Sequence, residues 1–244
     1  MPSTANKIAL ITGANKGIGF EVARQLGKKG CTVLVAARDA ELGQEAAAKL
    51  KKEGADARPI QLDVTHREAI EGARAQIEKE FGRLDILINN AGINDRGDGP
   101  PSKVDLDAVN RVLQTNFVGA LAVVQAMLPL IRKSAAGNII NVSSELGSIT
   151  GHSDPNWKFA PVKFIAYCAS KAAMNMMTVQ LAYELRDTNI KVNSVNPGYT
   201  ATDLNNHQGP QTIEEGSAEI IRVALIGNDG PSGQFLETGG SIPW

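Results

Sequence analysis

A tyrosine and a lysine four residues apart are the side chains of this sequence with the clearest potential for proton chemistry. Tyr167 and Lys171 lie in the segment Tyr-Cys-Ala-Ser-Lys, near the start of a helix expected over about residues 164–186. At this spacing both side chains project from one helix face. A free tyrosine has a pKa near ~10, and a neighbouring ammonium group favours the phenolate and lowers that pKa. The pair could therefore exchange a proton near neutral pH, although a surface tyrosine beside a solvated lysine has the same spacing.

A glycine-rich segment follows the first expected strand and opens a helix expected over Ile18–Lys29. Glycines permit a tight turn and a close approach of the backbone to a pyrophosphate, which the helix N-terminus stabilises through its free N–H groups and dipole. The segment indicates a dinucleotide site, and a plain tight turn is the alternative. The residues assigned to this site are Gly13, Asn15, Lys16, Gly17, Ile18 and Gly19.

The residues after the second expected strand, Thr32–Ala37, indicate which dinucleotide would bind. An acidic residue here accepts a hydrogen bond from the ribose 2′-hydroxyl of NAD, whereas an arginine accommodates the 2′-phosphate of NADP. Arg38 comes first, and Asp39 occupies the N-cap position of the helical pattern that follows. Lys16 could supply a second cation. Two cations at the two expected places favour NADP(H), and a solvated surface residue is the alternative for each.

Strand and helix patterns alternate along the chain, and this alternation predicts how the reactive groups are positioned. Short strands separated by helices imply a parallel sheet with helices on both faces, because parallel strands need crossover connections. The expected fold is a single α/β domain over residues 1–244, a doubly wound, Rossmann-type sheet of about seven parallel strands. The expected strands are Lys7–Thr12, Thr32–Ala37, Ala57–Leu62, Asp85–Asn89, Asn138–Ser143, Ile190–Val195 and Gln234–Glu237.

Two segments resist a regular assignment: 149–162, with two prolines, and 197–210, rich in Gly, Thr and Asn. Ligands of doubly wound sheets bind beyond the carboxyl ends of the strands, and both segments follow strands directly. We therefore expect 149–162 to form a loop on the substrate side and 197–210 to form a lid over the pocket.

Composition excludes several classes of function. The chain has 244 residues, of which 43% are hydrophobic and 21% charged, as in globular domains. A net charge of -1 gives no global attraction to nucleic acid or anionic membrane. Cys31 and Cys168 form no CxxC motif or Cys/His cluster, so neither a metal site nor a disulfide scaffold is expected, and a cytoplasmic location fits best. The apolar run Phe117–Ile131 is too short to span a bilayer and predicts a buried helix.

The order of the motifs is more specific than any one of them. After the glycine-rich turn come Leu-Asp-Val at 62–64, Asn-Asn-Ala-Gly at 89–92, Asn116, Asn-Val-Ser-Ser at 141–144, the Tyr–Lys segment and Pro-Gly at 197–198. This set, which extends over essentially the whole chain, resembles the short-chain dehydrogenase/reductase family. The Asn-Lys-Gly-Ile-Gly turn, Ala-Ala-Arg-Asp after the second strand, and Gly-Pro-Ser-Gly-Gln-Phe at 230–235 resemble the NADPH-dependent carbonyl reductases of that family.

The resemblance implies a catalytic tetrad of Asn116, Ser144, Tyr167 and Lys171. Tyr167 would donate a proton to a carbonyl oxygen as the nicotinamide delivers hydride to carbon, and Ser144 would stabilise charge on that oxygen. Lys171 would lower the pKa of the tyrosine and bind the nicotinamide ribose, and Asn116 would hold a water that passes protons onward. Further implied cofactor residues are Asp63 and Val64 at the adenine, Asn90 and Gly92 at the adenosine ribose, and Pro197, Gly198, Thr200 and Thr202 near the carboxamide or pyrophosphate. Asn90 and Asn116 could equally be structural caps.

The separation between Ser144 and Tyr167 is 23 residues, longer than in the commonest family pattern, so segment 149–162 contains an insertion. Its aromatic residues, Trp157 and Phe159, are expected to wall the substrate pocket, with pinning of the loop to the domain as the alternative. Tyr199 and Leu204 are expected in the same pocket. A longer insertion in the carbonyl reductases covers a surface that other members use to dimerise, so a homodimer and a monomer both stay open here.

Together these inferences predict an NADPH-dependent oxidoreductase that reduces a ketone or aldehyde to an alcohol, with a small carbonyl compound as its partner and neither nucleic acid nor membrane. One alternative is an NAD-preferring alcohol dehydrogenase that works in the oxidative direction, which Arg38 disfavours. The other is a dinucleotide-binding sensor without catalysis, which would be expected to lack the tyrosine or the lysine.

Overall fold

The computed structural model describes residues 6–244, so the first five residues of the expected 1–244 domain lie outside the described residues. The described strands are β1 (Ile8–Thr12), β2 (Thr32–Ala37), β3 (Ala57–Gln61), β4 (Ile86–Asn89), β5 (Gly137–Val142), β6 (Ile190–Val195), β7 (Phe235–Glu237) and β8 (Gly240–Ser241). They form one sheet in the order β3-β2-β1-β4-β5-β6-β7-β8. Strands β1 to β7 pair in parallel, and β8 pairs antiparallel with β7. The predicted doubly wound α/β fold is confirmed.

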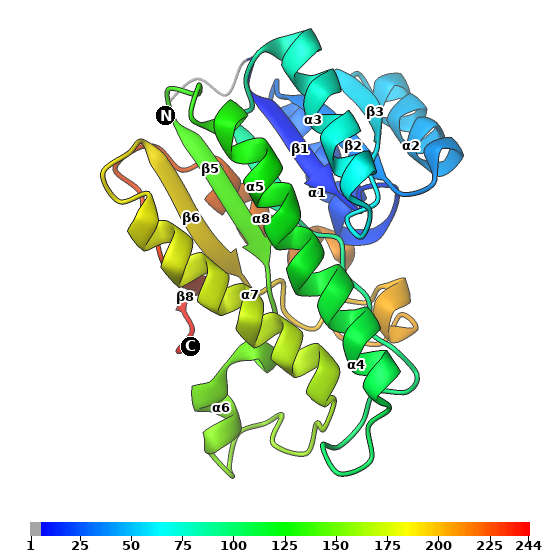
Figure 1. Ribbon diagram of the computed structural model, residues 1–244, viewed down its shortest axis with the longest axis vertical. Helices are drawn as coiled ribbons and strands as arrows, with labels where there is room; N and C mark the ends of the chain where they lie inside the picture. Colours follow the sequence, from blue (N-terminus) through cyan, green and yellow to red (C-terminus); the bar gives the residue numbers. More distant parts are fainter. Residues whose placement is uncertain (1–5) are drawn as a thin grey trace.

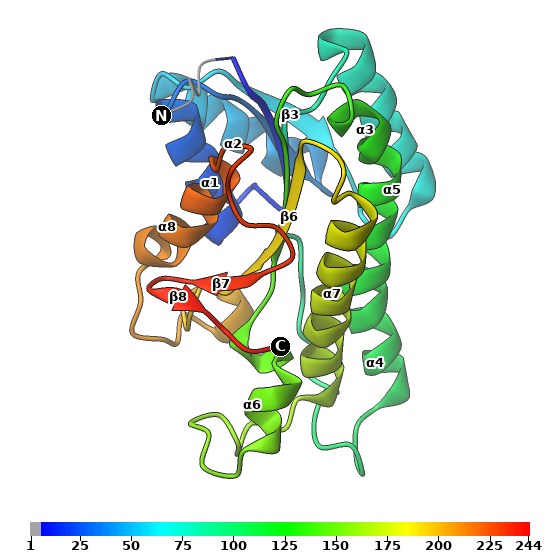
Figure 2. The ribbon, with the colours of Figure 1, turned by 90° about the vertical axis from the view of Figure 1, so that its left-hand side faces the viewer.

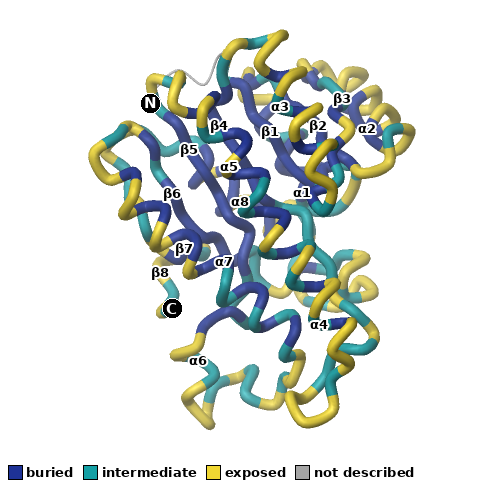
Figure 3. The backbone as a smooth tube through the Cα atoms, in the orientation of Figure 1, coloured by how far each residue is buried: buried dark blue, intermediate teal, exposed yellow. Residues whose placement is uncertain are grey.

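Two layers of helices enclose the sheet (Figures 1 and 2). The α-helices are α1 (Gly17–Lys28), α2 (Ala40–Lys52), α3 (Arg67–Phe81), α4 (Leu106–Leu113), α5 (Ala120–Ile131), α6 (Ile149–Ser153), α7 (Ile165–Glu184) and α8 (Ile213–Ala224). Figure 2 shows α1, α2 and α8 on one face of the sheet and α3, α5 and α7 on the other. Each face has its own hydrophobic cluster, so the central strands are buried on both sides, as Figure 3 shows in dark blue.

The structure departs from the expected elements in three places. The apolar run expected to form a buried helix, Phe117–Ile131, begins inside a π-helical turn, Gln114–Gly119, that joins α4 to α5. The irregular segment 149–162 begins with the short helix α6. Strand β8 follows β7 through a tight turn in which Gly239 has φ +100, and a strand of two exposed residues has no hydrophobic pattern that a sequence reading could detect.

The run Leu106–Ile131 is long and apolar enough to cross a membrane, judged by length and composition alone. In the fold, its second half packs against the sheet in the same layer as α3 and α7, with Val123, Met127 and Leu130 buried in the core. A core helix of this kind has the same hydropathy as a membrane span. The buried helix predicted over 117–131 is confirmed.

Helix α6 lies beyond the carboxyl end of the sheet, beside the end of the chain (Figure 1). The Thr150 N–H donates to the Trp244 carbonyl oxygen at 2.9 Å, and the Ser148 hydroxyl donates to the Pro243 carbonyl oxygen at 2.7 Å. The Trp244 ring stacks on Phe235 of β7 with 5.6 Å between centroids. These contacts fasten the start of the 149–162 segment to the sheet.

Candidate active site

A cavity of about 790 Å³ lies where the loops after β1, β2, β4, β5 and β6 meet, which is the expected position for a ligand of a doubly wound sheet. Most of the residues predicted from the sequence line it. These are Gly13, Asn15, Lys16, Gly17, Ile18, Gly19, Arg38, Asp63, Val64, Asn90, Gly92, Tyr167, Lys171, Pro197, Thr202 and Leu204.

The glycine-rich turn leaves a helix N-terminus open toward this cavity. Gly13 has φ +63 and Gly17 has φ +57, a backbone region that strongly favours glycine. A Cβ on Gly19 would lie 2.5 Å from the Asn90 amide nitrogen and 2.6 Å from the Gly13 carbonyl oxygen, so a side chain there would not fit. Among the described residues 6–244, the N-cap residue of α1 is Lys16, and its side chain makes no capping hydrogen bond to the helix. The first N–H groups of a helix have no partner within the helix, and together with the helix dipole they suit a pyrophosphate.

Asn90 connects the end of β4 to the glycine turn. Its side-chain amide donates to the carbonyl oxygens of Thr12 at 2.8 Å and Gly13 at 3.1 Å, and its own N–H donates to the Thr12 hydroxyl at 3.0 Å. Asn90 therefore has the structural role that the sequence left open, and it also lines the cavity.

The two charged residues after β2 differ in what they are free to do. One oxygen of Asp39 accepts from the N–H groups of Glu41 at 2.9 Å and Leu42 at 3.1 Å, which confirms the predicted N-cap of α2. Arg38 is exposed at the cavity, and among the described residues it has no side-chain hydrogen bond or ion pair. The carboxylate is thus engaged by its helix, while the guanidinium remains available to an anion.

The segment 197–210 reaches over the cavity and is held at two points. The Lys16 ammonium pairs with Asp203 at 2.6 Å, and Asp203 also lies 3.0 Å from the His207 imidazole. From the loop after β4, the Asn94 amide donates to the Leu204 carbonyl oxygen at 2.8 Å. Lys16, which was expected to face a phosphate, therefore pairs with a carboxylate of this segment.

Only the second of the two serines after β5 can serve Tyr167. The buried Ser143 hydroxyl donates to the side-chain amide oxygen of Asn175 at 2.7 Å, so this hydroxyl is bound to helix α7. The Ser144 hydroxyl accepts from the Leu146 N–H at 3.2 Å, and its interaction with Tyr167 lowers the pKa of that phenol. The catalytic role that the family resemblance implies for Ser144 stays a prediction.

The electrostatics of Tyr167 and Lys171 differ from the sequence prediction. Desolvation by the surrounding protein raises the pKa of Tyr167 to about 12, and the hydrogen bond from Ser144 opposes this rise only in part. Burial lowers the pKa of Lys171 to about 8. The Lys171 ammonium donates to the Val142 carbonyl oxygen at 2.8 Å and lies 5.6 Å from the Tyr167 ring centroid. The expected lowering of the tyrosine pKa is wrong for this arrangement, because burial disfavours the charged form of both groups.

Asn116 is fully buried in the π-helical turn, and its side chain is occupied by the protein. Its carbonyl oxygen accepts from the Ile93 N–H at 2.8 Å, and its amide donates to the Ile93 carbonyl oxygen at 2.9 Å and to the Ser170 hydroxyl at 3.0 Å. These hydrogen bonds give the Asn116 side chain a structural role. They hold Ile93, which lines the cavity, against helix α7.

Several predicted residues of segment 197–210 do not line the cavity. The Thr200 hydroxyl is buried and donates to the Pro197 carbonyl oxygen at 3.0 Å. Gly198 has φ +75, and a Cβ there would clash with the Gln211 side chain. Tyr199 is exposed and does not line the cavity, so its assignment to the pocket finds no support in this geometry.

The aromatic residues of the insertion also lie away from the cavity. The Trp157 ring meets His152 edge-on at 4.8 Å and Phe159 at 5.3 Å between centroids, and its N–H donates to Glu145 at 3.3 Å. Neither Trp157 nor Phe159 lines the 790 Å³ cavity. Their rings contact each other, His152 and Glu145, so this geometry does not support a place in the wall of this cavity, and their assignment to the substrate pocket stays a prediction.

Sequence reasoning missed a further group of lining residues: Asp39, Leu42, Leu62, Thr65, Ala91, Ile93, Asn94, Thr115, Val142, Ser143 and Asp203. Most of them lie next to a motif at a strand end, so their place in the sequence could have added them to the predicted site. Asp203 lies between the predicted Thr202 and Leu204 and could have been included in the same way. The contacts of Asn94 with Leu204 and of Lys16 with Asp203 gave no sequence signal, because the partners are 110 and 187 residues apart.

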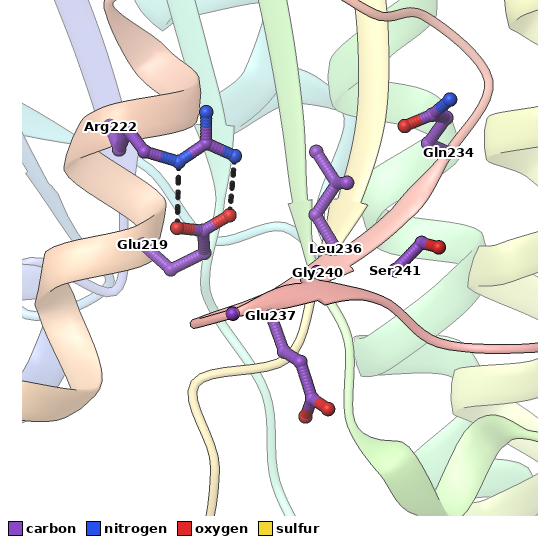
Figure 4. A pocket seen from close by; sticks show the side chains of 8 residues that line it. Glu219, Arg222, Gln234, Leu236, Glu237, Gly240 and Ser241 are labelled. Atoms are coloured by element: carbon purple, nitrogen blue, oxygen red, sulfur yellow. Dashed lines mark hydrogen bonds and ion pairs between the residues drawn. The ribbon is translucent and has the colours of Figure 1, made fainter.

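A second cavity, of about 420 Å³, lies between α8 and the β7–β8 hairpin (Figure 4). Arg222 donates to both carboxylate oxygens of Glu219, at 2.8 and 2.6 Å. The Glu237 side chain points away from this ion pair in Figure 4, and its carboxylate accepts from the Asn196 amide at 3.0 Å. The described residues that line this cavity include none of the predicted site residues, and its carboxylates would repel a phosphate.

With this geometry in place, the family can be established from known proteins. The sequence profile of the family described as "short chain dehydrogenase" matches residues 7–212. This chain belongs to the short-chain dehydrogenase family. The resemblance drawn from the ordered motifs is thus confirmed, and with it the identification as an oxidoreductase of this family.

Individual relatives match along nearly their whole length. The (+)-neomenthol dehydrogenase of Capsicum annuum is 31% identical over 96% of this chain and 96% of its own. The carbonyl reductase (NADPH) 1 of Mus musculus is 32% identical over 99% of this chain and 100% of its own. The crystal structure of NADPH-bound carbonyl reductase from chicken fatty liver matches with a TM-score of 0.85 and 26% identity, covering 98% of this chain and 99% of that one.

Proposed function

We propose that this short-chain dehydrogenase reduces a ketone or aldehyde to an alcohol with NADPH as the hydride donor. The observation that carries the proposal is that one cavity is bordered both by Tyr167 and Lys171 and by the N-terminus of α1 with Arg38 beside it, while Ser144 interacts with Tyr167. The first set suits proton donation to a carbonyl oxygen, and the second suits a phosphorylated dinucleotide. The NADPH named for the mouse and chicken carbonyl reductases supports the same cofactor.

The residues of the cavity fit NADP(H). The start of α1 would hold the pyrophosphate, and Arg38 and Lys16 would hold the 2′-phosphate, because a guanidinium and an ammonium are suited to phosphate oxygens. Asp63 and Val64 would contact the adenine. The other proposed cofactor contacts are Asn90 and Gly92 at the adenosine ribose, Lys171 at the nicotinamide ribose, and Pro197 and Thr202 near the carboxamide or pyrophosphate. When bound, NADPH supplies the hydride.

The protein's own contribution is to place and protonate the carbonyl group. A Tyr167 with a pKa of about 12 is a neutral phenol at physiological pH, so it can donate its proton to the carbonyl oxygen. The Ser144 hydroxyl would donate a hydrogen bond to the same oxygen and stabilise the charge that develops there. Protonated Lys171 would then stabilise the phenolate that remains. Since the Asn116 amide is occupied, the water-holding role proposed for this residue would rely on its main-chain carbonyl.

Several observations favour this proposal over its alternatives. An NAD-preferring alcohol dehydrogenase would be expected to present an acidic residue to the ribose. Asp39 lines the cavity but uses one oxygen to cap α2, whereas Arg38 has no side-chain hydrogen bond or ion pair among the described residues. A sensor without catalysis would have no need of the Ser144–Tyr167 contact. Cys31 and Cys168 are both buried thiols, which supports the cytoplasm as the site of action.

The test is a panel of small and bulky ketones, aldehydes and quinones with NADPH and with NADH, followed by loss of reduced-cofactor absorbance. In Tyr167→Phe the rate should fall by about 10² to 10⁴, while NADPH affinity stays near that of the wild type. Tyr183→Phe, on the exposed face of the same helix, is the matched control and should keep full activity. A Tyr167→Phe enzyme with more than about a tenth of the normal rate would contradict the proposal.

A further inference from the structure

The first turn of helix α7 is capped by a loop that is distant in the sequence. The two carboxylate oxygens of Asp98 accept from the main-chain N–H groups of Ala166 and Tyr167, each at 2.9 Å. The Ile165 N–H donates to the Gly99 carbonyl oxygen at 3.1 Å. The first N–H groups of a helix have no partner within the helix, and here this loop satisfies the first three. The residue directly before the helix supplies no side-chain cap.

The capping loop is itself anchored. The Asp98 N–H donates to the Asp95 carbonyl oxygen at 3.0 Å, and the Asp95 carboxylate accepts from the Arg111 guanidinium of α4 at 2.8 Å. Helix α4 also packs against α7. The carboxylate of Asp98 is therefore presented to α7 from a loop that is tied to the neighbouring helix.

We propose that Asp98 is a positioning residue for the reaction, which holds Tyr167 beside Ser144 by fixing the first turn of α7. The inference rests on the proposed function, in which Tyr167 is the proton donor. A helix end that loses its cap frays, and the carboxylate also interacts favourably with the helix dipole. A general acid must lie within hydrogen-bonding distance of its acceptor, so a displacement of ~1 Å can cost ~10²-fold in rate.

The geometry predicts that this role is selective. Lys171 lies one turn further along α7, is buried, and donates to the Val142 carbonyl oxygen of β5. Its position therefore depends on packing against the sheet and not on Asp98. Loss of the cap should lower kcat through Tyr167 and leave the affinity for NADPH, which Lys171 serves, nearly unchanged.

The experiment compares Asp98→Ala and Asp98→Asn with wild type and with Asp105→Ala, at a temperature where melting curves show every protein folded. Asp105 is the control for a helix cap near the same loop, because its carboxylate caps α4 by accepting from the Asp107 N–H at 3.0 Å and lies 3.7 Å from Arg111, but accepts no hydrogen bond from α7 among the described residues. We expect kcat of Asp98→Ala to fall by about tenfold or more, with the Kd for NADPH within about twofold of wild type. Asp98→Asn keeps one acceptor oxygen and should be intermediate, and Asp105→Ala should keep the normal kcat.

Amide hydrogen exchange of the peptide that contains the start of α7 gives a readout that does not depend on turnover. Exchange should be faster in Asp98→Ala than in wild type or Asp105→Ala, because three N–H groups lose their acceptors or become exposed. If Asp98→Ala does not fold, Asp98→Asn decides by the same two measurements. Faster exchange at this peptide together with a selective loss of kcat supports the inference.

Three results would overturn it. The first is a normal kcat for Asp98→Ala in an enzyme that Tyr167→Phe inactivates, which leaves the proposed function standing and removes only the positioning role. The second is an equal loss of kcat in Asp105→Ala, or a loss of NADPH affinity in proportion to kcat. The third is unchanged exchange at the start of α7. Activity retained in Tyr167→Phe would instead remove the proposed function, and with it the catalytic reason for the cap.

Discussion

Lys16 and Asp203 form an ion pair of 2.6 Å between the glycine turn and the segment after β6. The two side chains are 65% and 51% exposed. An exposed pair of this kind contributes only about 0–1 kcal/mol, so it can open at little cost. The pair thus joins segment 197–210 to the glycine turn while leaving Lys16 able to exchange its carboxylate partner for a phosphate.

Asp203→Asn tests this exchange. Removal of the carboxylate frees Lys16 and removes a negative charge from the neighbourhood of the 2′-phosphate, so NADPH should bind tighter relative to NADH by about two- to tenfold. The measurement is the Kd of each cofactor by fluorescence titration at low salt. Asp187→Asn, which removes an 85% exposed carboxylate elsewhere on the surface, is the control and should leave the ratio unchanged. An unchanged ratio in Asp203→Asn would show that Lys16 does not bind the 2′-phosphate.

Arg38→Asp tests the other cation. The substitution replaces a free guanidinium by a carboxylate that repels a phosphate and accepts from a ribose hydroxyl. The ratio of kcat/KM for NADPH to that for NADH should fall by at least about tenfold, with NADH becoming the better cofactor. Arg96→Asp, in the loop after β4 and outside the lining of the cavity, controls for the change in net charge. A wild type that already prefers NADH would contradict the assignment.

The fold was predictable because its central strands are buried on both faces. Strands such as Val33–Ala37 and Ile86–Ile88 therefore contain uninterrupted apolar residues, and the helices between them have one apolar face. The predicted N-cap at Asp39 depends on local spacing alone and was also correct. Strand β8 could not be predicted from the sequence, because two residues after a glycine turn have no hydrophobic pattern.

The site was predictable where it follows a strand directly and unpredictable where it depends on long-range packing. The glycine turn, Arg38 and Asp63 come at fixed distances from strand ends, and all of them line the cavity. The contacts of Lys16 with Asp203 and of Asp98 with Tyr167 join segments far apart in the chain, so no spacing reveals them. The pKa of Tyr167 was misjudged for the same reason, because burial depends on the whole fold.

The buried lysine makes stability depend on pH. Burial lowers the pKa of Lys171 in the folded protein to about 8, below its ordinary value of 10.5. Between these values the unfolded chain binds more protons than the folded one, so the free energy of unfolding should rise with pH across this window. Lys171→Met removes the titration. The stability of wild type relative to Lys171→Met should therefore increase by up to about 3 kcal/mol from pH 8 toward pH 10.5.

Urea unfolding of the cofactor-free proteins at pH 7.5 and at about pH 9.5 measures this difference, because groups common to both proteins cancel. Lys163→Met, which removes an exposed lysine near the start of the same helix, is the control and should show no such change. A stability difference between wild type and Lys171→Met that stays constant with pH would mean that Lys171 is not desolvated in the folded protein.

Truncation of a side chain in the insertion, 149–162, and truncation of one in segment 197–210 should affect substrate selectivity differently. Trp157 and Phe159 contact each other and their own segment, whereas Leu204 lines the cavity. Truncation of a side chain that borders the substrate changes kcat/KM differently for small and bulky substrates, but truncation of one that only packs a loop does not.

Trp157→Ala should therefore lower the free energy of unfolding by about 1–3 kcal/mol, less than for a fully buried aromatic residue because the ring is half-buried. Its kcat/KM for a small and for a bulky ketone should fall by the same factor, since the disturbed segment precedes α7 and affects all substrates alike. Leu204→Ala should leave the melting temperature nearly unchanged and shift the ratio of the two kcat/KM values by several-fold toward the bulky ketone. Thermal melts beside two-substrate kinetics measure both effects. If Trp157→Ala kept normal stability but changed the ratio of kcat/KM for the two ketones, Trp157 would be assigned to the substrate pocket.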